Sequence, residues 1–520
     1  MALDARAQQA VPAPPGLPRR ASGKALWLRR GVLLAAFAAL VGTGAWHSAK
    51  PLPPGLRIAS APLPVAPDDL RLLFDVTTAD GFGRPVLQHA IFDEKLAMIA
   101  AARRFVLLDQ FLLNAHGGAT DPASTSGNPL RPLSRELTEA LVAARRARPE
   151  LRVLLITDPV NDVYGGQPSA DLDRLAAAGV EVVRTDLDRL RDPNPAYSAF
   201  WRLAIRWWSG DGRGAGWLPN PLAEGPSRVT FRAWARLLNF KANHRKVLIA
   251  DDGAGGLVGL VGSSNPHDAS SAHSNAALQL RGDMLRALID SEQQVARFSG
   301  WRGEALPLPP AAPAAPGPGA AAATVRVLTE GAILDALLEQ LAATGTGDRV
   351  DVAMFYLAER NVIDALLAAA ARGAQVRVLL DPNKDAFGRV RSGIPNRPVA
   401  AELVARSDGA IRVRWYRTHG EQFHAKLVAI TRGGRTWLTT GSANLTRRNV
   451  GDFNLEANVA VELPSGSAPA RDAATWFDTL WNNLAPAGIE YTADFGTYAD
   501  PAQSRYWAFR IMEATGLSTF

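Results

Sequence analysis

The residues best able to carry chemistry are two His-x-Lys pairs, each of which opens an apolar, strand-like run. They are His244 and Lys246 in NHRKVLIADD, and His424 and Lys426 in FHAKLVAITR. Side chains two residues apart on a strand point to the same face, about 7 Å apart, so each pair presents an imidazole and an ammonium group to one ligand. With 8 His and 7 Lys in 520 residues, chance would give only about 0.1 such pairs. The repetition therefore indicates a function.

A Gly-Ser turn with an asparagine follows each histidine at nearly the same distance. The first turn, GSSN, begins 18 residues after its histidine and contains Ser263 and Asn265. The second, GSAN, begins 17 residues after its histidine and contains Ser442 and Asn444. Hydroxyl, amide and backbone N–H groups at such turns can donate hydrogen bonds to an oxyanion. We therefore expect these four side chains to bind phosphate oxygens.

Two imidazoles and two ammonium groups suit the cleavage of a phosphodiester. One neutral imidazole can attack phosphorus and form a phosphohistidine, while a second, protonated imidazole delivers the proton to the leaving alkoxide. The lysines and asparagines can hold the phosphoryl oxygens as negative charge develops. No Asp, Glu and His cluster in the sequence has convincing metal-ligand spacing, so we predict neither a metal nor another cofactor.

The elements around these motifs repeat along the chain. Strand-like and helix-like stretches alternate in the same order in residues 65–304 and 324–520, and a Pro/Ala-rich segment, 305–323, separates them. This alternation predicts an α/β fold built from two pseudo-repeated α/β sandwich halves, each with a mostly parallel sheet. The first half is longer because of a Trp- and Arg-rich insertion at 187–240.

The N-terminus has the features of a membrane-targeting segment. The chain has a net charge of +7, but its first fifty residues hold seven basic and one acidic side chain (+6), which leaves only +1 for the rest. The basic segment 1–30 precedes an apolar run at 31–46. We expect a transmembrane anchor with the body on the extracytoplasmic, periplasmic side. The alternative is a signal sequence that is cleaved to give a secreted protein.

The composition also limits the class of protein. The chain has no cysteine, which excludes disulfide frameworks, thiolate metal sites and cysteine nucleophiles. A body of nearly zero net charge argues against a broad nucleic-acid footprint. The tryptophans and arginines of the insertion suit a lipid headgroup layer, although a cap packed on the sheet would explain them too.

At this point the sequence resembles the phospholipase D superfamily. The mark of that superfamily is a twice-occurring H-x-K-x4-D followed by G-S-x-x-N or G-S-x-N. The resemblance implies an active site between the two halves, with His244 as the nucleophile and His424 as the general acid and base. The first motif keeps its aspartate, Asp251, whereas the second has Thr431 in that place. In the family this aspartate is commonly a structural support, so the change weakens the second motif without abolishing activity.

The resemblance also implies a carboxylate that orients the catalytic imidazole. Relatives hold this group where the second half reads NLE, with Glu456, and we expect Glu456 to raise the pKa of His424. The first half has Ala277 at the position that equal spacing makes equivalent, and Asp268 is a candidate substitute. Asp158 and Asp381, each before a proline, are expected to cap turns. The histidines outside the motifs are expected at the surface or in loops: His89, His116, His267, His273 and His419.

The leading hypothesis is a phospholipase D-like enzyme that acts on membrane phospholipids. It would either hydrolyse a headgroup to leave phosphatidate or transfer the phosphatidyl group to an alcohol, as cardiolipin synthases of this superfamily do. The alternatives are a nuclease of the same superfamily, which needs a basic groove with stacking aromatics, and a catalytically impaired binding relative, which the loss at Thr431 would suit. The expected partners are a phospholipid substrate and a membrane, with nucleic acid the weaker candidate.

Overall fold

The computed structural model describes most of the chain. The described residues are 23–79, 85–116, 130–210, 212–222, 226–311, 323–386, 389–484, 489–518 and 520. Most of the basic segment predicted at 1–30, and residues 312–322 of the predicted linker, lie outside them. The first linker residues pack on the first half, because Ala305 O accepts a hydrogen bond from Arg152 (2.9 Å) and Pro309 O accepts one from Arg286 (2.6 Å).

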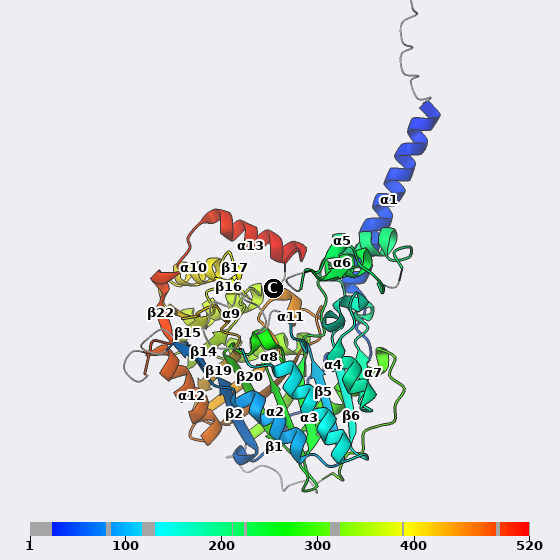
Figure 1. Ribbon diagram of the computed structural model, residues 1–520. Coiled ribbons are helices and arrows are strands. Elements are labelled where there is room, and N and C mark those ends of the chain that lie inside the picture. Colours follow the sequence, from blue (N-terminus) through cyan, green and yellow to red (C-terminus); the bar gives the residue numbers. More distant parts are fainter. Residues whose placement is uncertain are drawn as a thin grey trace, which may run out of the picture.

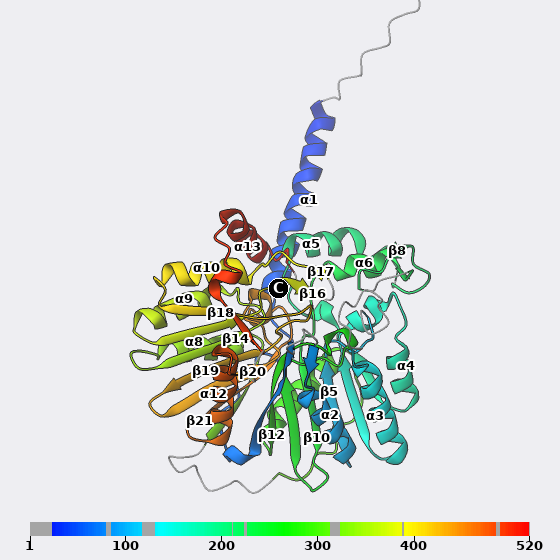
Figure 2. The ribbon, with the colours of Figure 1, turned by 60° about the vertical axis from the view of Figure 1, so that its left-hand side comes forward.

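Two large sheets lie side by side, one in each half of the chain (Figure 2). In spatial order, the seven-stranded sheet consists of β2 (Leu70–Asp75), β12 (Asn275–Arg281), β11 (Leu257–Gly262), β10 (Lys246–Asp251), β5 (Phe105–Gln110), β6 (Arg152–Thr157) and β7 (Glu181–Arg184). The nine-stranded sheet consists of β1 (Leu63–Val65), β13 (Ala323–Thr329), β21 (Ala457–Pro464), β20 (Arg435–Gly441), β19 (Lys426–Arg432), β14 (Arg349–Met354), β15 (Gln375–Leu380), β18 (Ile411–Tyr416) and β22 (Thr492–Asp494). Seven strands of the second sheet repeat the order of the first.

The sheets are mixed, and the expectation of mostly parallel sheets was wrong. Only β5–β6–β7 and β14–β15–β18 run parallel. The strands that begin at the His-x-Lys pairs, β10 and β19, are antiparallel to both of their neighbours. The reason is the short connection to the next strand, residues 252–256 in one half and 433–434 in the other. Such a connection permits a hairpin but not the long crossover that parallel pairing requires.

Helices cover the outer face of each sheet. On the first sheet these are α2 (Ala90–Ala101), α3 (Leu133–Ala147) and α4 (Ala170–Ala177), and on the second they are α8 (Gly331–Ala342), α9 (Arg360–Ala371) and α10 (Asn396–Arg406). The inner faces share one buried core with α7 (Leu285–Phe298) and α12 (Ala468–Trp481), to which Leu107 and Val247 contribute from the first half and Val327 and Leu427 from the second. Burial of each such side chain stabilises the fold by about 1.5–3 kcal/mol.

The predicted N-terminal segment is a helix that projects from the body (Figure 1). Helix α1 (Gly23–Ala49) extends beyond both ends of the predicted run 31–46, and its apolar stretch, Leu26–Ala49, would be about 36 Å long. It is the one helix in the described part of the chain that is long and apolar enough to cross a membrane. A bilayer core is about 30 Å thick, so length and composition are compatible with an anchor.

The insertion predicted at 187–240 forms a small cap next to α1. It contains α5 (Pro195–Phe200), a π-helical turn at Trp201–Ile205, the short pair β8 (Leu218–Pro219) and β9 (Arg228–Val229), and α6 (Phe231–Leu237). Its aromatic residues divide into two groups. Trp201 is buried in the cap, whereas Trp207, Trp208 and Trp217 are exposed. The insertion is therefore a packed cap that also presents exposed indole rings.

Candidate active site

The structure brings the two His-x-Lys pairs together where the halves meet. Each histidine lies two residues before the strand that its lysine begins, and its backbone is held by the opposite half. The N–H of His244 donates to Leu455 O (2.9 Å), and the N–H of His424 donates to Ser274 O (2.8 Å). The charges on each pair affect the pKa values of the other pair. The predicted location of the site, between the halves, agrees with this arrangement.

Each lysine is buried beneath an aromatic ring. Lys246 Nζ donates to His244 O (2.6 Å), and Lys426 Nζ donates to His424 O (2.9 Å). Phe111 lies 4.8 Å from Lys246 Nζ, and Phe355 lies 5.4 Å from Lys426 Nζ, in each case measured to the ring centroid. The same two rings contact the histidine of their own half. This packing fixes the direction of both ammonium groups.

Burial shifts the pKa values of both lysines. It lowers the pKa of Lys246 to about 7, with Glu456 acting in the opposite direction. Burial, and then repulsion from Lys246, holds the pKa of Lys426 well below its ordinary value. A bound anion would favour the charged forms of both groups. The site is therefore suited to an anionic ligand that replaces the lost hydration.

Glu456 contacts the histidine of the other half, which corrects the expected pairing. Its carboxylate lies 2.9 Å and 3.1 Å from Nδ1 of His244, not beside His424. Ser442 and Asn449 donate two further hydrogen bonds to the same carboxylate. Burial opposes ionisation of Glu456, but His244, the positive charge of Lys246 and the hydrogen bond from Ser442 keep the pKa of Glu456 below its ordinary value. Glu456 reaches the histidine of the first half because the preceding residue, Leu455, pairs with Asn243 across the boundary between the halves.

The position equivalent to Glu456 in the first half is Asn275, not Ala277. Ser263 N–H donates to Ala276 O, as Ser442 N–H donates to Ala457 O, so the residue before each acceptor is the counterpart. The segment that leads from the Gly-Ser turn to the next strand is two residues shorter before β12 than before β21. An alignment that assumes equal spacing in both halves therefore places Ala277, and not Asn275, opposite Glu456. Asp268, the other candidate, instead accepts hydrogen bonds from the N–H (2.9 Å) and hydroxyl (2.8 Å) of Ser134.

Asn275 contacts His424 and was not among the residues that the sequence indicated. Its Oδ1 lies 3.2 Å from Nδ1 of His424 and accepts the hydroxyl of Ser263 at 3.0 Å. Its Nδ2 lies 3.4 Å from a carboxylate oxygen of Asp75, whose pKa burial raises to about 7. A neutral amide thus occupies the place of a carboxylate. Asparagine carries no charge, so nothing in the composition of this segment pointed to it.

The two motif histidines consequently have different electrostatic surroundings. Burial lowers the pKa of His244 to about 4, although Glu456 acts to raise it. Burial and the positive charge of Lys426, followed by His273, Lys246 and His244, hold the pKa of His424 well below its ordinary value. The expectation that Glu456 raises the pKa of His424 was therefore wrong. His273, predicted at the surface, is buried with its ring 5.6 Å from that of His424.

The serines and asparagines of the Gly-Ser turns have separate roles. Ser263 and Ser442 donate to Asn275 and Glu456, so they hold the partners of the histidines and are not free to bind phosphate as expected. Asn265 and Asn444 are buried, and within the described part of the chain the Oδ1 atom of each lacks a hydrogen-bond partner. Buried amides normally find partners. These two asparagines remain the candidates for ligand contact.

Asp251 lies outside the cluster, at the far end of β10 from Lys246. It accepts hydrogen bonds from the backbone N–H groups of residues 103–105 at 2.7–3.1 Å. At the equivalent position Thr431 contacts Thr436 across the β19–β20 hairpin, with their hydroxyls 3.3 Å apart. Asp251 is therefore a structural residue and not part of the catalytic group. The replacement by Thr431 leaves the site itself intact.

Asp158 and Asp381 hold the backbone directly before each histidine. One carboxylate oxygen of Asp158 accepts from Asn243 N–H and the other from Val160 N–H, both at 2.7 Å. Asp381 makes the same pair of bonds to Phe423 N–H (2.7 Å) and Asn383 N–H (2.6 Å). The predicted capping role is confirmed. It extends further than expected, because the same carboxylates position the histidine loops.

Comparison with known proteins agrees with this geometry. Residues 337–481 match the family model described as cardiolipin synthase, PLD-like domain. The crystal structure of phosphatidylserine synthase from Haemophilus influenzae Rd KW20 has the same fold, with a TM-score of 0.52 at 10% identity over 92% of this chain and 98% of that chain. Residues 337–481 are thus similar to a phospholipase D-like domain, and the chain as a whole shares the fold of the phosphatidylserine synthase structure.

Two other solved structures are less similar. Polyphosphate kinase from Porphyromonas gingivalis has a TM-score of 0.41 at 12% identity over 86% of this chain and 56% of that chain. The phospholipase D family member Nuc from Salmonella typhimurium has a TM-score of 0.25 at 19% identity, over 33% of this chain and 97% of that chain. A comparison with curated proteins gave no match.

Proposed function

We propose that the protein is a phosphatidyltransferase that cleaves a phospholipid diester through a phosphohistidine at His244. The observation that carries the proposal is the hydrogen bond between His244 Nδ1 and Glu456. A carboxylate at Nδ1 holds the proton on that nitrogen, so that Nε2 keeps the lone pair needed for attack. The same carboxylate stabilises the positive charge that develops on the ring when Nε2 bonds to phosphorus.

In the first step, His244 Nε2 forms a bond to phosphorus and the bond from phosphorus to the headgroup oxygen breaks. Protonated His424 transfers its proton to that oxygen, and the headgroup alcohol leaves. The pKa of His424 is low in the free site, and the negative charge of a bound diester raises it. Lys246, Lys426 and the amides of Asn265 and Asn444 would hold the non-bridging oxygens.

In the second step, neutral His424 removes a proton from the acceptor, whose oxygen attacks phosphorus and displaces His244. An alcohol as acceptor gives a new phospholipid, and water gives phosphatidate. The match of residues 337–481 to the cardiolipin synthase family model supports the alcohol. Phosphatidylglycerol would then serve both as donor and as acceptor, and the products would be cardiolipin and glycerol.

We further propose that α1 is an uncleaved anchor, with the N-terminus in the cytoplasm and the body in the periplasm. Arg29 and Arg30 on the N-terminal side support this orientation. The small residues Thr43, Gly44 and Ala45 are where a signal peptidase would most readily cleave. The helix continues without a break through them and packs on the body beyond them. Asp192 N–H donates to His47 O (2.9 Å), and Lys50 Nζ donates to Asp188 O (2.8 Å).

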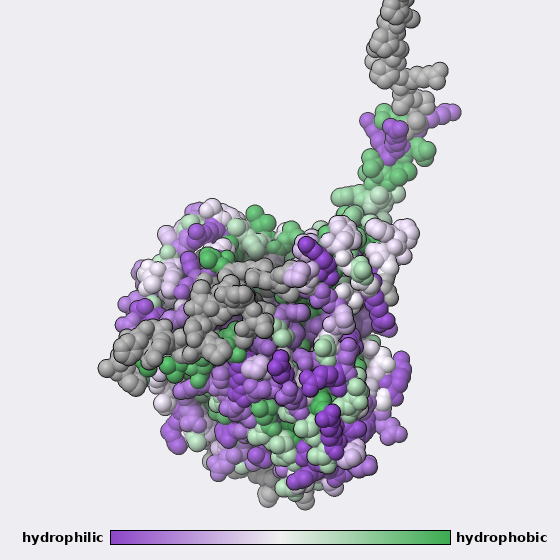
Figure 3. Space-filling view, viewed as in Figure 1, coloured by the Kyte–Doolittle hydropathy of each residue, from purple (hydrophilic) through white to green (hydrophobic). Residues whose placement is uncertain are grey.

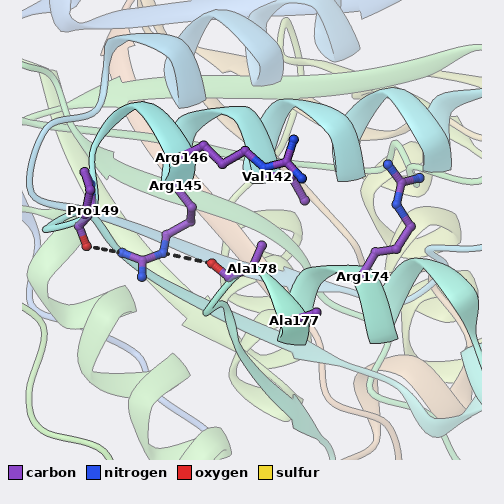
Figure 4. Close-up of a pocket in the computed structure, with 7 residues that line it drawn as sticks. All are labelled: Val142, Arg145, Arg146, Pro149, Arg174, Ala177 and Ala178. Carbon is purple, nitrogen blue, oxygen red and sulfur yellow. Dashed lines mark hydrogen bonds between the residues drawn. The ribbon is translucent and has the colours of Figure 1, made fainter.

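The nuclease alternative has less support. Arg145, Arg146 and Arg174 line a surface pocket between α3 and α4 (Figure 4). This pocket lies at the ends of β5 and β6 that are remote from the histidines, and Arg145 is bonded to the carbonyls of Pro149 and Ala178. It provides no basic path to the site.

The reaction can be tested by incubating the purified full-length protein in vesicles with radiolabelled phosphatidylglycerol or phosphatidylcholine, and separately with DNA. We expect labelled cardiolipin from phosphatidylglycerol. Phosphatidate alone would identify a hydrolase, and cut DNA with unchanged lipid would overturn the proposal. A His244→Ala variant, prepared in parallel, controls for contaminating lipases.

A further inference from the structure

Exposed apolar side chains gather on the insertion beside α1. Trp207 is 76% exposed and Trp208 is 56% exposed, and Phe200 and Leu203 are exposed in the turns before them. Isolated exposed apolar residues are common, but neighbouring large ones mark an interaction surface. These four residues lie within nine positions of the chain, on α5 and the turns that follow it.

A second group lies on α13 (Gln503–Thr515) near the C-terminus. Trp507 and Ile511, one helical turn apart and hence on one face, are 59% and 60% exposed. The opposite face of α13 is anchored, because Phe509 is fully buried in the core of the second half. Helix α13 is therefore held in place with two large apolar side chains directed outward.

The two groups and α1 meet at one place. A Cβ atom on Gly44 of α1 would lie 3.1 Å from the carbonyl oxygen of Pro195, so α1 and α5 pack closely. A Cβ atom on Gly516, at the end of α13, would lie 1.9 Å from Pro193 O, so that only glycine fits there. Figures 1 and 2 show α5, α6 and α13 on the side of the body from which α1 projects, and Figure 3 shows hydrophobic residues along this edge.

We infer that this surface, the docking face, lies against the bilayer that α1 spans. It consists of Phe200, Leu203, Trp207, Trp208, Trp507 and Ile511. Tryptophan favours the boundary between headgroups and acyl chains, and Trp46, exposed at the base of α1, lies at the same end of the helix as the contact with α5. Because α1 is held against the body, a bilayer around α1 meets the docking face without any rearrangement.

The docking face is also joined to the active site. Arg448, in the short helix α11 (Arg447–Val450) after the second Gly-Ser turn, donates to the carbonyl oxygens of Gly516 (3.2 Å) and Ser518 at the end of α13. The next residue, Asn449, donates to Glu456. Two neighbouring residues of α11 thus connect the end of α13 to Glu456, the partner of His244. Docking itself does not depend on catalysis, so an inactive His244→Ala chain should dock equally.

The absence of cysteine allows a direct test on the full-length chain. Single cysteines at Leu203 and Ser504, which leave all the tryptophans in place, would carry an NBD fluorophore at either end of the docking face. The control is Ala254→Cys, in the exposed turn between β10 and β11 at the far end of β10 from Lys246. The labelled proteins are reconstituted in phosphatidylethanolamine/phosphatidylglycerol vesicles that contain a lipid with a spin label near its headgroup.

We expect the lipid spin label to quench the fluorophores at 203 and 504 several-fold more than the fluorophore at 254, in active and His244→Ala chains alike. Equal quenching at all three positions would overturn the inference. So would protection at 203 or 504 from both the lipid spin label and aqueous iodide, because a protein partner or a second copy would then cover the face. Quenching at only one of the two positions would overturn the inference that the exposed residues of the insertion and of α13 form one membrane-facing surface.

Discussion

The two halves of the site differ in the partner that each histidine contacts. His244 faces the carboxylate of Glu456, and His424 faces the amide of Asn275, although both partners occupy equivalent positions in the repeated fold. A carboxylate stabilises a positively charged imidazole, whereas an amide oxygen orients the ring without adding charge. The backbone folds of the two halves are therefore nearly symmetric, whereas the charges around the two histidines are not. This difference supports a division of labour in which His244 becomes the covalent, charged intermediate and His424 exchanges protons with substrate.

The strongest test of this comparison is to remove each imidazole. His244→Ala and His424→Ala should each lower turnover by at least about 10³-fold, because the covalent step and the proton transfer are both lost. With a phosphodiester that has a nitrophenol leaving group, which needs no proton, His424→Ala should still release nitrophenol and accumulate phosphohistidine, whereas His244→Ala should do neither. The measurement is the amount of labelled phosphoprotein, formed from substrate labelled at phosphorus and separated on gels run without acid, because phosphohistidine is acid-labile. A labelled His244→Ala chain would reverse the assignment.

Removal of the charge on Glu456 should have the next largest effect. Glu456→Gln should lower kcat about 10- to 100-fold, since the loss of a supporting partner of an imidazole typically has this size. Asn275→Ala, the matched change in the other half, should lower kcat less because no charge is lost. Steady-state kinetics on mixed micelles would compare them. A larger loss in Asn275→Ala would contradict the proposed asymmetry.

A carboxylate introduced beside His424 should make the halves more alike. In Asn275→Asp, combined with Asp75→Asn to avoid a second adjacent carboxylate, the new charge should raise the pKa of His424 by about one unit or more. Protonated His424 would then persist to higher pH, so the alkaline limb of the kcat/KM profile should move upward. Asp75→Asn alone is the control. An unchanged or lowered limb would show that His424 is not the proton donor.

The smallest effects on activity are expected at the far ends of the two motif strands. Asp251→Ala removes the acceptor of four backbone N–H groups, those of residues 103–105 and of Gly253, and should lower Tm by several degrees, because each buried donor left unpaired costs about 1–3 kcal/mol. Thr431→Ala should change Tm little, since it removes one contact between hydroxyls. Thermal melts and kcat values of both variants would check this. A loss of activity in Asp251→Ala without a change in Tm would instead place Asp251 among the catalytic residues.

The sequence predicted the residue types of the site better than the contacts between them. His-x-Lys and Gly-Ser-x-Asn are local patterns, so their residue types and spacing sufficed to predict two elements suited to a phosphodiester. That the two elements meet was implied by the resemblance to the phospholipase D superfamily. The contact of Glu456 with His244 depends on Leu455 pairing with Asn243 across 212 positions, which no local pattern encodes. Asn275 was missed because the segment that leads to it is two residues shorter than its counterpart. The mixed sheets followed from hairpin lengths that alternation of strands and helices does not report.

The backbone bridges between the halves also determine when a working site can exist. Asn243 pairs with Leu455, and Ser274 pairs with Phe423, so each half, taken alone, would leave these backbone groups without partners at the future site. Neither half contains a histidine together with its own supporting side chain. An incomplete chain still bound to the ribosome, or a fragment cut between the halves, therefore lacks part of the proposed active site. A membrane that receives this protein would encounter the proposed lipid-cleaving activity only from the fully assembled chain.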